Sequence, residues 1–147
     1  MSSTHVDLLL VEDNAADAFL IENFLNNSQL STTLHKVLDG EAAMQFLRRE
    51  NDYANAPRPN LILLDLNLPK KDGREVLEEL KADPDLKAIP VIVMTGSAAA
   101  QDILRSYQLH ASCYITKPSD LNDFNKAMQS LENFWFNYVQ LPKSVTS

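Results

Sequence analysis

At residues 61–65 the chain reads Leu61-Ile62-Leu63-Leu64-Asp65, an unbroken apolar run that ends in a carboxylate. A short run of this kind, without polar alternation, is typical of a strand that is buried on both faces of a parallel sheet. The sequence therefore predicts that Asp65 stands at the tip of a buried strand. Open α/β sheets bind their ligands at such tips.

Three further apolar runs also end in polar residues that can take part in chemistry. These residues are Glu12 and Asp13 after the run at 8–11, Thr95 after the run at 91–94, and Lys117 after the run at 113–116. The carboxyl ends of parallel strands share one edge of a sheet. We therefore expect three carboxylates, one hydroxyl and one amine to meet at a single rim.

Helical patterns separate these runs, so strands and helices are expected to alternate along the chain. The expected helices begin near Ala15 with Asn14 as N-cap, near Gly40, near Arg74, near Ala99, and after Ser119. A fifth, more exposed strand is expected at residues 33–37. Strict alternation of five strands and five helices predicts an α/β fold with a parallel sheet and helices on both of its faces.

The composition of the chain limits the classes of function that it can have. A chain of 147 residues fits one domain. Its net charge of -7 argues against nucleic acid as a partner. Cys113 is the only cysteine, which suits a reducing compartment. The sequence has no apolar stretch of membrane-spanning length and no signal-peptide pattern, so we expect a cytoplasmic protein without a membrane segment.

The residues at the rim also suggest a chemistry. Carboxylates held close together repel one another unless a cation neutralises them, and hard oxygen ligands favour Mg²⁺. A phosphoryl group attacked by Asp65 would need charge compensation, which a metal on one side and Lys117 with Thr95 on the other can supply. The set predicts an aspartyl-phosphate site.

These residues resemble the receiver domains of two-component response regulators over residues 6–130. The resemblance is carried by the acidic pair Glu12-Asp13, by residues 65–73 as Asp-x-x-x-Pro-x-x-Asp-Gly, by Thr95 and by Lys117-Pro118. It implies a flavodoxin-like, doubly wound (βα)5 fold with strand order 2-1-3-4-5. An extended C-terminal helix and tail would then occupy residues 131–147.

The resemblance further implies a role for each residue at the rim. Asp65 is the expected phosphorylation site, and Asp13 and Asp65 are expected to bind Mg²⁺ together with the backbone carbonyl of Asn67, with Glu12 acting through water. The other expected roles are phosphate binding and switching by Thr95, Lys117 and Tyr114, tuning of dephosphorylation by Asn67 and Ser97, and a cis peptide bond before Pro118.

Residues 58–77 and the aromatic tail that ends in Leu141-Pro142 are similar to single-domain response regulators that serve cyanobacterial phytochromes. This similarity implies a phytochrome-type sensor histidine kinase upstream and a phosphorelay that passes phosphate to Asp65. The chain is then a phosphoacceptor signalling protein and not an enzyme, although it assists its own phosphorylation and dephosphorylation. With no output domain in the chain, we expect it to signal to an unknown downstream protein through a phosphorylation-dependent change of its surface.

Two other classes of protein fit part of the pattern. A pseudo-receiver that has lost phosphorylation is disfavoured because Asp13, Asp65, Thr95 and Lys117 are all present. A Mg²⁺-dependent phosphohydrolase of the haloacid dehalogenase type needs a second aspartate two residues after its nucleophile, and here that position is Asn67. A nucleotide- or flavin-binding role is weaker still, because no glycine-rich turn follows the first apolar run.

The C-terminal segment carries more apolar side chains than one helix face requires. A helical stripe is formed by Leu121, Phe124, Met128, Leu131, Trp135 and Tyr138, whereas Ala127, Phe134 and Phe136 fall outside it. The extra aromatic side chains predict an exposed contact surface. The resemblance to receivers that pair through the fourth helix, the fifth strand and the fifth helix implies a symmetric homodimer that uses Leu131, Phe134, Trp135, Phe136 and Tyr138. The alternative is that the tail folds back over its own domain.

Overall fold

Five strands and five α-helices alternate along the chain in the computed structural model, which describes residues 5–28 and 31–142. The strands are β1 (Val6–Val11), β2 (Thr32–Val37), β3 (Leu61–Leu64), β4 (Val91–Thr95) and β5 (Cys113–Thr116). The helices are α1 (Ala15–Asn26), α2 (Gly40–Arg48), α3 (Gly73–Ala82), α4 (Ala100–Gln108) and α5 (Leu121–Leu131). Two short helical segments, η1 (Asn51–Tyr53) and η2 (Glu132–Phe136), complete the described elements.

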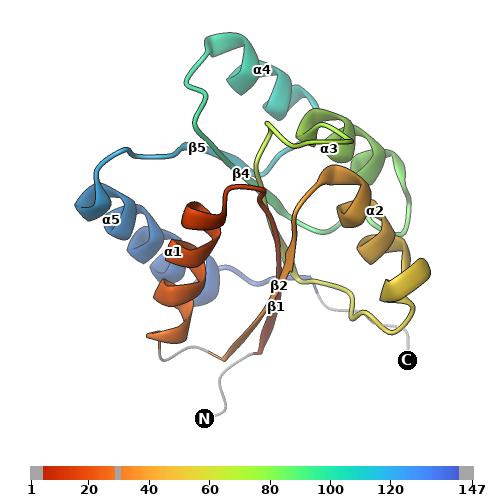
Figure 1. Ribbon diagram of the computed structural model, residues 1–147, viewed down its shortest axis with the longest axis horizontal. Coiled ribbons are helices and arrows are strands. Elements are labelled where there is room, and N and C mark those ends of the chain that lie inside the picture. Colours follow the sequence, from red (N-terminus) through yellow and green to blue (C-terminus); the bar gives the residue numbers. More distant parts are fainter. Residues whose placement is uncertain (1–4, 29–30, 143–147) are drawn as a thin grey trace.

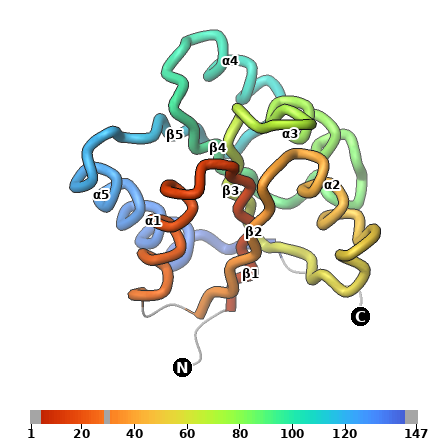
Figure 2. The backbone as a smooth tube through the Cα atoms, in the orientation of Figure 1, coloured from red at the N-terminus to blue at the C-terminus, as the bar shows by residue number. Residues whose placement is uncertain are grey.

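All strand pairs in the sheet are parallel, and the strand order is β2-β1-β3-β4-β5. Figures 1 and 2 show α1 and α5 on one face of the sheet and α2 and α3 on the other, with α4 beside α3. The predicted flavodoxin-like fold and strand order are confirmed.

The core is divided by the sheet into two apolar layers. Successive side chains of a strand point to opposite faces, so each central strand contributes to both layers. Leu9, Val11, Ile62 and Leu64 pack with the buried residues of α2 and α3. Leu8, Leu10, Leu61 and Leu63 pack with those of α1 and α5. This double burial explains why these strands read as continuous apolar runs.

Local sequence signals fix where several helices begin. The side chain of Asn14 accepts a hydrogen bond from the Asp17 N–H at 3.0 Å and caps α1, as expected. Asp39 caps α2 by accepting from the Ala42 N–H at 2.7 Å. Asp120 caps α5, which therefore starts after Ser119 as the sequence predicts. The caps place these helix starts close to the carboxyl edge of the sheet (Figure 1).

Gly73 allows α3 to begin directly against the end of β3. A Cβ atom at this position would lie 2.2 Å from the carbonyl oxygen of Asp65 and 2.7 Å from the Cα of Leu66. The Gly73 N–H also donates to the Leu66 carbonyl at 2.9 Å. Only glycine fits this corner, which holds the backbone at Asp65 in a fixed position.

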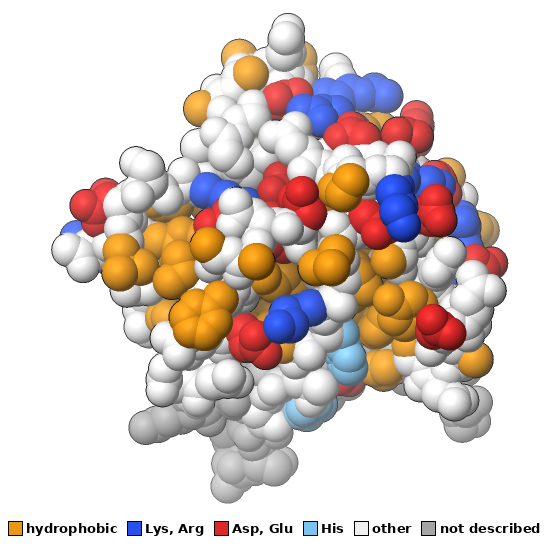
Figure 3. Space-filling model, in the orientation of Figure 1, with side chains coloured by type: hydrophobic (Ala, Val, Ile, Leu, Met, Phe, Trp, Pro, Cys, Tyr) orange, Lys and Arg blue, Asp and Glu red, His pale blue; other side chains and the backbone are white. Residues whose placement is uncertain are grey.

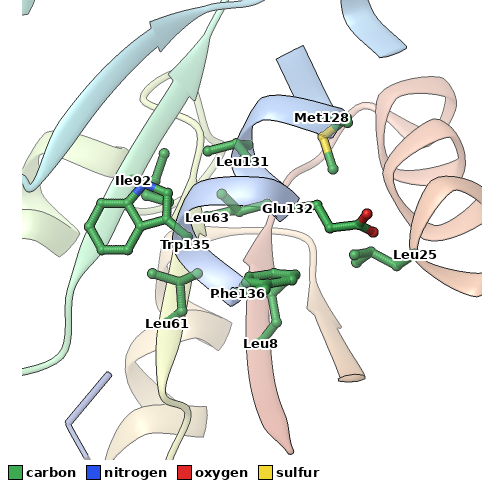
Figure 4. Close-up of a pocket in the computed structure, with 10 residues that line it drawn as sticks. All are labelled: Leu8, Leu25, Leu61, Leu63, Ile92, Met128, Leu131, Glu132, Trp135 and Phe136. Carbon is green, nitrogen blue, oxygen red and sulfur yellow. The ribbon is translucent and has the colours of Figure 1, made fainter. Parts of the chain in front are cut away.

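The C-terminal segment differs from the predicted helical stripe. After α5 the chain makes a π-helical turn, η2, and this wider turn moves Phe136 onto the same face as the buried Leu131. Figure 4 shows Trp135 and Phe136 beside Leu8 and Leu61. Trp135, Phe136 and Leu141 all pack against the α1/α5 layer of the core.

The tail therefore folds back over its own domain as far as Pro142, whose carbonyl accepts a hydrogen bond from the Asn60 side chain at 3.5 Å. Residues 143–147 of the expected tail lie outside the described residues. Phe134 and Tyr138, in contrast, are 57% and 76% exposed. The stripe was wrong at Tyr138, because the regular spacing of α5 ends at Leu131. It was also wrong at Leu121, which is exposed at the first position of α5.

Among residues 5–28 and 31–142, none of the helices combines the length and the apolar character that a membrane crossing requires.

Candidate phosphoacceptor site

The carboxyl edge of the sheet gathers the polar residues that the sequence places at its strand ends. Asp65 follows β3, Glu12 and Asp13 follow β1, and Thr95 is the last residue of β4. Asp65, Glu12 and Thr95 are buried, whereas Asp13 is exposed. In Figure 3 acidic and basic side chains lie side by side across the upper half of the molecule, where these strand ends meet.

Lys117 is the centre of the site. Its Nζ donates to Glu12 Oε1 at 2.6 Å, to Asp17 Oδ2 at 2.8 Å and to Asp65 Oδ2 at 3.0 Å. The side chain is only 12% exposed, and its three N–H donors each have a carboxylate acceptor. The lysine after β5 therefore reaches the aspartate after β3, as the sequence predicts.

Asp17 is a member of this cluster that the sequence analysis did not select. It lies in the first turn of α1, on the helix that Asn14 caps. The position of Asp17 in the sequence could have indicated this role. An acidic residue in the first turn of a helix that starts at the rim can point back to the rim. The prediction considered only residues at strand ends and so passed over it.

The three predicted acidic residues also fit a divalent cation. One oxygen atom from each of Glu12, Asp13 and Asp65 lies within 4.8 Å of the other two. Three carboxylates supply the hard oxygen ligands that Mg²⁺ and Mn²⁺ prefer. The N–H of Asn67 donates to Asp65 Oδ1 at 3.1 Å, which keeps Asn67 next to the same carboxylate.

Burial and charge change the acidity of the site residues in opposite directions. Burial raises the pKa of Glu12 to about 7 despite its hydrogen bond to Lys117. Burial would also raise the pKa of Asp65, but the nearby Thr95 hydroxyl, the Lys117 ammonium and the Asn67 N–H hold it below its usual value. Burial alone would lower the pKa of Lys117, but its hydrogen bonds to Asp17, Glu12 and Asp65 raise it. Asp65 therefore stays ionised, as a nucleophile must.

Of the expected switch residues, Lys117 donates to Asp65, whereas neither Thr95 nor Tyr114 makes a hydrogen bond to it in the described part of the chain. Thr95 Oγ1 is buried and makes no hydrogen bond to any other described residue. The Tyr114 hydroxyl, half-buried on β5, donates to the Ser97 carbonyl at 2.8 Å. The Ser97 hydroxyl donates away from the site, to Asp102 Oδ2 on α4 at 2.6 Å.

The expected cis peptide bond before Pro118 is not found, because every peptide bond among the described residues is trans. For an X–Pro bond the trans form is favoured by about 0.5–1 kcal/mol. The Lys117 N–H donates to the Thr95 carbonyl at 2.7 Å and so continues the pairing of β4 and β5. This pairing brings Lys117 to the site without a cis bond.

A doubly wound sheet of this order, with an aspartate, an acidic pair, a threonine and a lysine at four strand ends, defines the class of receiver domains. Residues 8–129 match the family described as "Response regulator receiver domain", and the chain therefore belongs to this family. This family membership favours the receiver over the alternative hypothesis of a phosphohydrolase of the haloacid dehalogenase type.

Comparison with known proteins is more specific. The chain is 53% identical over 135 residues to the response regulator Rcp1 of Synechocystis sp., and the match covers 92% of each chain. The Mn²⁺-bound structure of Rcp1 has a TM-score of 0.91 at 52% identity and covers 94% of this chain and 99% of its own. The structure of the phosphorylated cyanobacterial phytochrome response regulator RcpA has a TM-score of 0.92 at 51% identity. This match covers 95% of the present chain and 100% of the RcpA chain.

These similarities confirm the predicted resemblance: the chain is a response regulator receiver close to those of cyanobacterial phytochrome signalling. The Mn²⁺ in Rcp1 and the acidic residues Glu12, Asp13 and Asp65 agree with the predicted divalent metal site.

Proposed function

We propose that this receiver takes a phosphoryl group from the phosphohistidine of a sensor kinase onto Asp65. A carboxylate oxygen of Asp65 forms the new bond to phosphorus, the bond from phosphorus to the imidazole nitrogen breaks, and that nitrogen keeps the electron pair. The observation that carries the proposal is the 3.0 Å contact between Lys117 Nζ and Asp65 Oδ2 inside a buried acidic site. A cation this close can neutralise charge that develops on the transferred group.

Asp13 and Asp65 would hold a divalent metal directly, with the backbone carbonyl of Asn67, and Glu12 would hold it through water. The metal, when bound, supplies positive charge to the phosphoryl oxygens. In this way the chain would assist its own phosphorylation. Asn67 and Ser97 would set how fast the phosphate is lost by influencing the attacking water.

Thr95, Lys117 and Tyr114 would convert the phosphate into a change of surface. The buried Thr95 hydroxyl makes no hydrogen bond within residues 5–28 and 31–142, so it would be free to donate to a phosphate oxygen on Asp65. Movement of Thr95 towards the phosphate would leave space for Tyr114 to turn inward, while Lys117 pairs with another phosphate oxygen. The loop at residues 96–100 would move with them.

The upstream kinase would be of the phytochrome type. The support for this proposal is the similarity to RcpA, which is a phytochrome response regulator. The chain would act in the cytoplasm, where its single cysteine, Cys113, would stay reduced. Its output would be contact with a downstream protein.

We also propose that the receiver forms a symmetric homodimer. Of the five residues expected at the interface, Leu131, Trp135 and Phe136 already pack on their own domain. The dimer would therefore rest on the exposed Phe134 and Tyr138, of which Phe134 borders the apolar surface that β5 and α5 form with Cys113 and Ile115. Exposed aromatic side chains beside such a surface are typical of contact sites.

Incubation with acetyl phosphate and Mg²⁺ tests the phosphoacceptor proposal directly. The wild type should gain the mass of one phosphoryl group, and Asp65→Asn, which keeps the shape but not the nucleophile, should gain none. Phosphate transfer from a purified phytochrome kinase, compared with a sensor kinase of another class, tests the pairing. Equal phosphorylation of the wild type and Asp65→Asn would refute the assignment of Asp65.

A further inference from the structure

Asp17, on α1, is a partner of Lys117 that the proposed chemistry does not use. Its Oδ2 accepts a hydrogen bond from Lys117 Nζ at 2.8 Å. The same Nζ donates to Glu12 at 2.6 Å and to Asp65 at 3.0 Å. Glu12 and Asp65 also belong to the acidic group that fits a cation, whereas Asp17 is outside that group in the part of the chain that the structure describes. Asp17 is therefore a carboxylate that Lys117 need not share with a metal.

The usual role of an acidic residue at this place in a helix does not explain Asp17. It is the third residue after the cap Asn14, where an acidic side chain can accept a hydrogen bond from the N–H of the capping residue. Here the Asn14 N–H donates to Glu12 Oε2 at 3.0 Å, and the carboxylate of Asp17 contacts Lys117. The Asn14 side chain accepts from the Asp17 N–H at 3.0 Å. One turn of the chain therefore holds both Glu12 and Asp17 in position around the lysine.

Lys117 reaches this turn across the sheet, which makes its position depend on its partners. It follows β5, whereas Glu12 follows β1, and β3 and β4 lie between these strands. A long lysine stem loses rotamer freedom when its end is held in one place. Its ammonium would also be repelled by a divalent cation bound to the same carboxylates. Burial lowers the pKa of Lys117, but hydrogen bonds raise it above its usual value, and the bond to Asp17 contributes most to this rise.

We propose that Asp17 is a positioning residue that keeps the Lys117 ammonium beside Asp65 when a divalent metal binds, so that one lysine and one metal ion can share the same carboxylates. The inference rests on the proposed function, since it assumes that the acidic group Glu12, Asp13 and Asp65 binds the metal. A bound cation would draw these carboxylates away from Lys117 and leave Asp17 as its counter-charge. The contact between Asp17 and Lys117 is then worth more with the metal bound than without it, so Asp17 favours metal binding by acting through Lys117.

The affinity for Mg²⁺ tests this role without reference to phosphorylation. Asp17→Asn keeps the size of the side chain and removes its charge, and it should weaken Mg²⁺ binding by about fivefold, as expected for one charge-assisted contact in a partly exposed pair. In a Lys117→Met background there is no ammonium to hold. The same change should then weaken binding by less than about twofold, because only the screened attraction between Asp17 and the metal remains. The difference between the two effects measures the coupling through Lys117.

Asp7 offers a matched control for the loss of one negative charge. Its side chain is 27% exposed, as is that of Asp17, and it lies near the start of β1, at the opposite end of the strand from Glu12. Asp7→Asn changes the net charge as Asp17→Asn does, and it should leave the affinity for Mg²⁺ unchanged. Urea unfolding in a chelator checks that each variant is folded. If Asp17→Asn does not fold, Asp17→Ser, which also lacks the charge, carries the same test.

The outcomes separate the role of Asp17 from the proposed function. Unchanged Mg²⁺ affinity in Asp17→Asn, beside a wild type that binds Mg²⁺, overturns the role of Asp17 alone. An equal loss in the Lys117→Met background also overturns it, because Asp17 would then act on the metal directly, and so does an equal loss in Asp7→Asn. A wild type that binds no Mg²⁺ contradicts the proposed metal site, and the role of Asp17 with it.

Discussion

The carboxyl edge of the sheet and the C-terminal segment bury their side chains for opposite reasons. At the edge, Glu12, Asp65 and Lys117 are charged groups removed from water, and each is tolerated because it has a partner of opposite charge. In the C-terminal segment, Leu131 and Phe136 are apolar groups that gain by leaving water. Substitutions at the carboxyl edge should therefore change phosphorylation more than stability. Substitutions in the C-terminal segment should change stability more than phosphorylation.

Removal of Asp13 gives the largest expected effect and tests the first half of this comparison. Asp13→Ala should abolish Mg²⁺ binding and phosphorylation by acetyl phosphate, because it removes a metal ligand. The fold should remain intact, since Asp13 is exposed and its charge repels that of Asp65. Mg²⁺ titration, phosphoprotein mass and urea unfolding measure the three quantities. Phosphorylation at the wild-type level in Mg²⁺ would exclude the proposed metal site.

Truncation of Leu131 tests the second half. Leu131 is buried at the end of α5 and, with Trp135 and Phe136, lines the apolar cavity shown in Figure 4. Leu131→Ala should lower the free energy of unfolding by about 2–4 kcal/mol, because it removes buried apolar surface and leaves a cavity. The rate of phosphorylation should stay the same at a temperature where the variant is folded. A loss of phosphorylation larger than the loss of folded protein would show that the two regions are coupled.

The raised pKa of Glu12 should have a smaller effect, which is to make the stability of the domain depend on pH. Folding raises this pKa from 4.5 to about 7, so the unfolded chain loses the proton at lower pH than the folded chain does. The associated stability is fully present below about pH 4.5 and is lost as the pH rises through about 7.

Glu12→Gln removes this titration. In a chelator at about pH 8, the variant should be more stable than the wild type by on the order of 1–3 kcal/mol, and near pH 4 the difference should shrink. Urea unfolding at both pH values measures it. A gain that is independent of pH would mean that Glu12 has an ordinary pKa in the folded chain.

A charge at Phe134 should have the smallest effect on folding. Phe134→Asp should lower stability by only about 0.5–1 kcal/mol, because the side chain is exposed and loses little beyond its edge contact with the Trp135 ring. It should nevertheless turn the proposed dimer into a monomer in sedimentation. Phe19→Asp, at an exposed phenylalanine on α1, is the matched control and should leave the dimer intact. A wild type that is monomeric at high concentration would contradict the dimer.

The two regions also differ in how far the sequence predicts them. Asp65, Glu12, Asp13, Thr95 and Lys117 all follow apolar runs, and parallel pairing alone brings such positions to one edge. Asp17 and Asp102 lie on helices, and their contacts depend on how each helix is rotated against the sheet, which strand patterns do not determine. The same limit applies to the C-terminal segment, where a single π-helical turn replaced the expected Tyr138 with Phe136 on the buried face.

The tight fit at Gly73 means that the β3 side of the site can move less easily than the β4 side. The corner between β3 and α3 has no spare volume, since even a methyl group would overlap the backbone of Asp65 and Leu66. A close-packed corner does not yield, so strain from a new charge on Asp65 cannot relax towards α3. At the end of the neighbouring strand β4, a Cβ at Gly96 would meet no atom of the described residues within 4 Å. If Asp65 is phosphorylated as proposed, we expect the resulting strain to relax on the β4 side, through the loop at residues 96–100, and not on the β3 side.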